Sequence, residues 1–215
     1  MGEAILLEKG KIAENVQKLS VYIDSDKMLK KAFGLIKIKK ENAKRKIAFL
    51  MIMSIIAFMM AISEKTAVQT EEALEMLNTV MLSLFGIVFT GYALFQAMIG
   101  DELLILLVEL DPADKEETSS KLEETNVYFI KVMMLQFFII LTNLLLRISL
   151  KLLPPDWNLF GSQIINEGIC FIGVLAILDV NVEIIWEIKC FIFNVFQLYN
   201  LHAVSRILNM LRKSE

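Results

Sequence analysis

The sequence predicts an all-α membrane protein that crosses the bilayer four times. Apolar residues make up 56% of the 215 residues, above the roughly 45–50% that is typical of soluble domains. Only three prolines and nine glycines interrupt the chain, which favours long helices. Four apolar segments within a transmembrane domain over 47–178 have about the length of membrane spans, at 47–62, 76–99, 127–146 and 159–178.

Residues 1–46 are predicted to form a basic, helical region in the cytoplasm. Apolar residues recur at helical spacing up to Ile23, and the turn from Asp24 to Asp26 can cap a following helix. Basic side chains gather just before the first span, where we expect them to contact anionic lipid or to take part in gating. They are Lys37, Lys39, Lys40, Lys44, Arg45 and Lys46.

The second and third spans are connected by an acidic cytoplasmic loop over 100–126. The second helix is expected to continue past Gly100, because nothing before Pro112 breaks it. Ser120 and Glu123 have the spacing of a capping box, so the third helix should begin well before its span. That helix should end near Pro154, since proline cannot continue it.

The C-terminal segment 179–215 is predicted to be an amphipathic helix in the cytoplasm or at the membrane surface. A fifth span over 182–201 is the alternative, but it would bury Glu183, Glu187 and Lys189 at about 2.5–3.5 kcal/mol each. No glycine or proline separates this segment from the fourth span. Its strongly apolar surface requires a partner, most simply other copies of the chain.

Lysine and arginine are distributed unevenly between the flanks of the spans. If both termini are cytoplasmic, eighteen basic residues lie on the cytoplasmic side and three lie outside. Because basic residues in short loops are retained in the cytoplasm, the sequence predicts a multi-pass protein with both termini inside.

The second span carries a stripe of small residues, which we name the small-residue stripe. Its members recur every three or four residues, and small residues let helices approach closely in lipid. The stripe is either a packing surface within the chain or the lining of a narrow pore between copies. It consists of Thr79, Ser83, Gly86, Thr90, Ala93, Ala97 and Gly100.

Polar residues within the third and fourth spans are further candidates, because polar groups that face lipid are costly. Those of the third span share one helix face and should meet protein or water: Gln136, Asn143 and Arg147. Those of the fourth span are Gln163, Asn166 and Glu167. Glu167 is expected near mid-membrane, where it either pairs with Arg147 or Lys151, is protonated and neutral, or forms a carboxylate ring that attracts cations.

The small net charge of −3 conceals two opposed regions. Residues 1–46 hold twelve basic and six acidic residues, a net charge of +6, whereas residues 100–126 hold two basic and nine acidic residues, a net charge of −7. Both regions are expected on the cytoplasmic side. They are either separate solvated faces or a basic gate docked on an acidic vestibule, and such docking would weaken with salt.

The sequence lacks the groups that catalysis or metal binding requires. One histidine and two cysteines are too few for a zinc site, and there is no P-loop, GxSxG or HExxH motif. We therefore expect no enzyme, no catalytic residue, no metal and no cofactor. Nucleic-acid binding is not expected either, because the basic region is helical and adjoins a span.

A homo-oligomeric channel gated from the cytoplasmic side fits these features, because a pore needs no reactive residues and four spans rarely enclose a water path. The expected partners are the lipid bilayer, other copies of the chain, and a cytoplasmic regulatory ligand or protein. The alternatives are a non-conducting scaffold or complex subunit, and a small transporter.

A basic cluster over 37–46 precedes a methionine-rich span, and an acidic segment over 100–126 follows the second span. In this layout the chain resembles the small multi-span membrane effectors of bacterial anti-phage defence systems. The resemblance implies a channel-like protein of the bacterial inner membrane that permeabilises the membrane when a signal arrives. It assigns no functional residue.

Overall fold

The described part of the chain is helical throughout. The computed structural model describes residues 24–36, 43–63, 65–110, 120–153 and 160–213. The fold class predicted from the sequence is confirmed to that extent. The elements are α2 (Ser25–Ala32), the 3₁₀ helix η1 (Phe33–Ile36), α3 (Ala43–Ala61), α4 (Thr66–Met98), α5 (Asp101–Glu109), α6 (Lys121–Leu152) and α7 (Gln163–Lys213).

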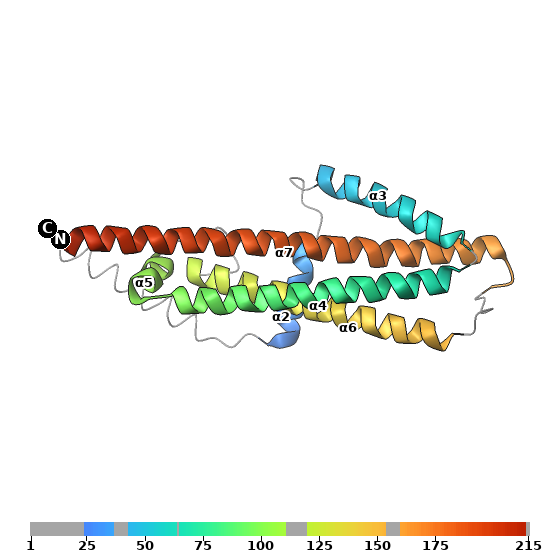
Figure 1. Ribbon diagram of the computed structural model, residues 1–215, viewed down its shortest axis with the longest axis horizontal. Helices are drawn as coiled ribbons and strands as arrows, with labels where there is room; N and C mark the ends of the chain where they lie inside the picture. Colours follow the sequence, from blue (N-terminus) through green and yellow to red (C-terminus); the bar gives the residue numbers. More distant parts are fainter. Residues whose placement is uncertain (1–23, 37–42, 64, 111–119, 154–159, 214–215) are drawn as a thin grey trace.

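Three long helices, α4, α6 and α7, lie side by side along the length of the molecule (Figure 1). α6 runs antiparallel to the other two. α3 leans against one half of α7, α2 packs on α6 near its middle, and α5 lies at the opposite end of the molecule from the α3–α4 turn. The molecule is therefore an elongated bundle with short helices attached at its sides.

α4, α6 and α7 are each long and apolar enough to cross a membrane. The first expected span, 47–62, lies almost entirely in α3, but that helix has only 19 residues and carries three basic ones in its first turn, Lys44, Arg45 and Lys46. Most of its large apolar side chains are exposed, among them Ile55 and Met59. The crossing of α3 stays a prediction, as does the cytoplasmic position of both termini. The docking of the basic region 1–46 on the acidic loop 100–126 also stays a prediction, because residues 1–23, 37–42 and 111–119 lie outside the described residues.

α7 is one continuous helix of 51 residues. The predicted division at 178 between a fourth span and a separate C-terminal helix therefore marks no break in the backbone. At about 1.5 Å per residue the helix is roughly 76 Å long, which is more than twice the roughly 30 Å of a hydrocarbon core. A large part of α7 must lie outside any bilayer that it crosses.

The predicted extension of the second helix past Gly100 is wrong. α4 ends at Met98, and Ile99 and Gly100 have extended backbone conformations before α5 begins at Asp101. Glycine is about 1 kcal/mol less favourable than alanine inside a helix, so this position ends a helix without any proline.

The other predicted helix ends are confirmed. The Ser120 hydroxyl accepts a hydrogen bond from the backbone N–H of Glu123 and caps α6. The Asp24 carboxylate accepts one from the N–H of Asp26 and caps α2. α6 ends at Leu152, two residues before Pro154.

The main core lies between α4, α6 and α7 and is built from large side chains. The buried ring of Phe129 lies 5.2 Å from the ring of Phe95 and 4.6 Å from that of Phe191, measured between centroids. α4 lies close to α7 at Gly91, where an added Cβ would lie only 2.9 Å from the Phe191 ring. Gly91 is not part of the small-residue stripe, so the close approach within the chain uses a different face of α4.

Candidate functional site

Two faces of α4 differ in the size of their side chains. A row of bulky residues spaced seven apart, Leu74, Met81, Val88 and Phe95, is fully buried against the rest of the chain. All seven members of the small-residue stripe are exposed. The interpretation of the stripe as a packing surface within the chain is therefore wrong, because α4 packs inward through its large side chains.

Three hydroxyl groups along the small-residue stripe are held by the helix that carries them. Thr79 donates to the Glu75 carbonyl at 2.9 Å, Ser83 to the Thr79 carbonyl at 2.9 Å, and Thr90 to the Gly86 carbonyl at 2.8 Å. Each hydroxyl oxygen keeps lone pairs that can accept further hydrogen bonds. The stripe is thus a narrow, mildly polar surface that tolerates either another helix or water.

An open groove of about 500 Å³ runs between α4 and α7 beside this stripe. The absence of side chains at Gly86 and Gly91 hollows out its α4 wall, while Phe191, Ile192 and Val195 form the α7 wall. Ser83 and Thr90 also line it, so the small-residue stripe and the exposed side of α7 form one continuous surface.

The polar face of α6 meets protein, which is one of the two surroundings that the sequence left open for it. The buried Gln136 amide donates to the Met81 carbonyl of α4 at 3.0 Å, and its own oxygen has no hydrogen-bond partner among the described residues. Asn143 and Asn181 exchange amide hydrogen bonds of 2.9 and 3.3 Å between α6 and α7. These amides connect helices inside one chain and do not line a path for solutes.

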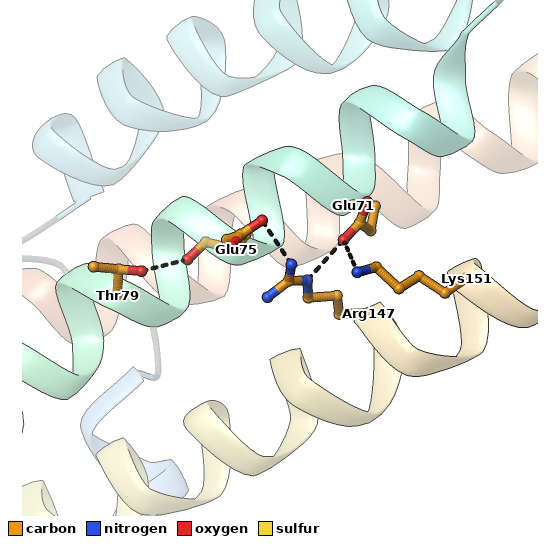
Figure 2. Close-up of polar contacts among 5 residues, drawn as sticks. All are labelled: Glu71, Glu75, Thr79, Arg147 and Lys151. Atoms are coloured by element: carbon orange, nitrogen blue, oxygen red, sulfur yellow. Dashed lines mark hydrogen bonds and ion pairs between the residues drawn. The ribbon is translucent and has the colours of Figure 1, made fainter.

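Arg147 joins α6 to two carboxylates of α4, and Figure 2 shows it lying between them. Its Nε lies 2.7 Å from Glu71 Oε1 and one terminal nitrogen lies 2.6 Å from Glu75 Oε2, while Lys151 Nζ lies 3.3 Å from Glu71. We name these four residues the Arg147 network. Arg147 and Glu71 are half-buried, whereas the other two side chains are more than half exposed.

The predicted pairing of Glu167 with Arg147 or Lys151 is wrong, because both bases bind α4 instead. Glu167 lies in the second turn of α7 and accepts a hydrogen bond of 2.8 Å from Gln163 in the same helix. Asn166 bonds to the backbone of Phe160 through both its amide oxygen and its amide nitrogen, at 3.0 and 2.7 Å. The three polar residues of the predicted fourth span therefore organise the beginning of α7.

Two of the six basic residues expected to contact lipid or to take part in gating instead bind a buried carboxylate, in an ion cluster that we name the Glu183 cluster. Arg45 and Lys46 of α3 lie 3.1 and 3.0 Å from the same oxygen of Glu183 in α7. Only 3% of the Glu183 side chain is exposed, and Lys46 also donates to the Ile36 carbonyl. Arg45 lies over the ring of Trp186, 4.3 Å from its centroid.

The remaining basic residues leave the gating prediction open. Lys44 is exposed at the first turn of α3, and Lys37, Lys39 and Lys40 lie outside the described residues. The sequence did contain a signal for the Glu183 cluster. A carboxylate within an apolar helix requires a basic partner, and α3 begins with three bases.

No family model matches the chain, and no curated protein or solved structure matches it either. Within the described ranges no group of histidine, cysteine and acidic side chains could hold a metal ion. Most of the polar side chains predicted in the third and fourth spans are engaged within the chain. The small-residue stripe with its adjoining groove is the predicted site that the chain leaves open to a partner or a solute.

Proposed function

We propose that several copies of this chain assemble in a membrane and form a channel bordered by the small-residue stripe. The observation that carries the proposal is the exposure of the whole stripe, of which all members but Gly100 lie on α4. A helix that packs inward through large residues and keeps its small residues outside is suited to close contact with identical neighbours.

The interior of a single chain is unsuited to conduction. Phe95, Phe129 and Phe191 fill the space between the three long helices. The buried Asn143 and Asn181 amides bond to each other instead of facing an opening. Any water-filled path therefore lies between copies, where the hydroxyls of Thr79, Ser83 and Thr90 would supply a weakly polar lining.

The first experiment measures current through purified protein in a planar bilayer, using a variant with Cys170→Ala and Cys190→Ala as the background. Ser83→Cys is placed on the stripe, and Ser149→Cys is its matched control. Ser149 is also exposed and also donates to the carbonyl four residues earlier, but it lies on α6. A charged thiol reagent should block most of the current of the Ser83→Cys channel and leave the Ser149→Cys channel unchanged.

Two results would contradict the proposal. Absence of discrete currents under every gating condition would rule out a channel. Equal block of the two cysteine variants would rule out the stripe as the border of the pore. The first result would favour the non-conducting scaffold, whereas the second would place the pore at another surface of the protein.

The proposal extends to an effector that dissipates ion gradients across the bacterial inner membrane under cytoplasmic control. Production of the protein together with its activating signal should then depolarise bacterial cells within minutes, as read by a potential-sensitive dye. Ser83→Trp, which fills the stripe with a large ring, should abolish the depolarisation, and Ser149→Trp should not. If both tryptophan variants still depolarised the cells, the small-residue stripe would not be required for depolarisation.

A further inference from the structure

The C-terminal part of α7 has one face that is buried in the chain and an opposite face that is largely exposed. Residues spaced seven apart on one face, Ile184, Phe191 and Leu198, are buried in the chain's own main core. The opposite face repeats with spacings of three and four from residue 193 onward, and all of its members except the half-buried Ala203 are exposed. Its members are Phe193, Phe196, Asn200, Ala203, Ile207 and Met210.

This spacing is the a/d repeat of a coiled coil. If Phe193 occupies position a, then Asn200 and Ile207 also occupy a, and the buried residues Phe191 and Leu198 occupy f, the position farthest from the seam. Inward packing and the exposed seam therefore use opposite sides of one helix and do not compete. We name the exposed a/d residues the C-terminal seam.

Lipid is poorly placed to cover the C-terminal seam. A hydrocarbon core of about 30 Å accommodates roughly 20 helical residues. A crossing that begins at the polar first turns of α7, after Glu167, therefore ends near Glu187. The seam begins beyond that point, so its large side chains need a protein partner.

The exposed area suits a second copy. More than half of each side chain is exposed at Phe193, Phe196, Tyr199, Val204, Ile207 and Met210. Scaled from the roughly 150–250 Å² of a buried aromatic side chain, they present about 600 Å² per copy. A pair would bury about 1,200 Å², the lower limit of a standard specific interface.

We propose that the C-terminal seams of neighbouring copies pack together as a parallel, in-register helical bundle that assembles the protein. Copies inserted in one membrane have the same orientation, so their α7 helices are parallel, and their spans keep them at high effective concentration. Asn200 is the polar a-position residue that sets register, because in-register packing lets its amide pair with the same amide of the neighbour. This contact deepens the proposed channel, since it names the surface that assembles the copies.

Cysteine crosslinking in native membranes tests this contact with two chemically identical substitutions. Asn200→Cys lies on the seam, and Asn194→Cys lies one residue beyond Phe193 at position b; both asparagines are exposed in the same helix. Cys170→Ala and Cys190→Ala form the background. Mild oxidation should yield at least about ten times more covalent dimer through residue 200 than through residue 194.

A second substitution tests assembly without crosslinking. Ile207→Asp places a charge at a seam position in each copy and should shift the full-length protein in detergent from an oligomer to a monomer. Gln197→Asp, an exposed change at a flanking position, should leave the oligomer intact. Equal or absent crosslinking through residues 200 and 194, or an unchanged oligomer with Ile207→Asp, would overturn the proposal and leave lipid or another protein as the cover of this face.

The outcomes are distinguishable from those for the channel. Crosslinked copies that carry no current would overturn the channel and leave the seam contact standing. A current in the absence of crosslinking through residue 200 would overturn the seam contact and leave the channel standing.

Discussion

The Glu183 cluster and the Arg147 network each place two basic side chains against carboxylates of a neighbouring helix, but they differ in exposure. Glu183 and Lys46 are almost completely buried, with 3% and 9% of their side chains exposed. In the Arg147 network, 24% of Arg147 and 57% of Lys151 are exposed. The same kinds of ion pair therefore lie in two different environments, one shielded from water and the other partly open to it.

This difference determines which contacts the fold depends on. Removing one partner from a buried ion pair leaves an uncompensated charge that water cannot reach. Removing one partner from an exposed pair lets water and salt replace it. The Glu183 cluster should thus be essential for holding α3 on α7, whereas the Arg147 network should adjust the contact between α4 and α6.

The largest effect is expected from Glu183→Gln. It leaves Arg45 and Lys46 without their shared carboxylate and should destabilise the packing of α3 by about 3–5 kcal/mol. The measurement is the thermal stability of the detergent-solubilised protein by fluorescence-detected size exclusion. Glu72→Gln removes an exposed carboxylate and serves as the control. Equal losses of thermal stability for the two variants would show that the Glu183 cluster is not buried in the detergent-solubilised protein.

An intermediate effect is expected from Asn143→Leu, which breaks the neutral buried pair located between the two charged groups. The Asn181 amide oxygen loses its partner, and an unsatisfied buried group costs about 1–3 kcal/mol. The double variant Asn143→Leu with Asn181→Leu should recover most of the thermal stability, because no unpaired amide remains. Failure of the double variant to recover would mean that shape, and not hydrogen bonding, makes this contact specific.

Arg147→Met should have a smaller effect than either buried change. Glu71 and Glu75 then face each other across one turn of α4 without their bridging base, but both can turn toward water. Thermal stability should fall less than it does for Asn143→Leu, and Glu75→Gln in the same chain should restore part of it by reducing the repulsion. A loss as large as that of Glu183→Gln would place the Arg147 network in a low-dielectric region.

Lys151→Met should have the smallest effect and the clearest salt dependence. Its ammonium group lies 3.3 Å from Glu71 on an exposed side chain, where screening by salt is strong. Any loss of thermal stability at low salt should disappear at high salt. Persistence of the loss at high salt would indicate that the pair is shielded from solvent.

Local patterns in the sequence predicted much of this fold. Apolar segments without proline predicted the long helices, and the spacing of Ser120 and Glu123 predicted where α6 begins. The shared face of Gln136, Asn143 and Arg147 predicted contacts with protein or water, and the structure shows contacts with protein. Each of these features depends on residues within a few turns of one helix, so periodicity and capping chemistry are sufficient to find them.

The tertiary structure decided which surfaces and charges meet, since those choices depend on residues far apart in the chain. Both sides of α4 have a helical repeat, and only the packing of Phe95 against Phe129 and Phe191 shows that the bulky side faces inward. Glu183 lies 138 residues from Arg45 in the sequence. Arg147 binds carboxylates of α4 because α4 and α6 lie side by side, and no local pattern specifies that neighbour. The periodicity of a sequence specifies which residues share one face of a helix. Which helix packs against that face depends on how the side chains of all the helices fit together.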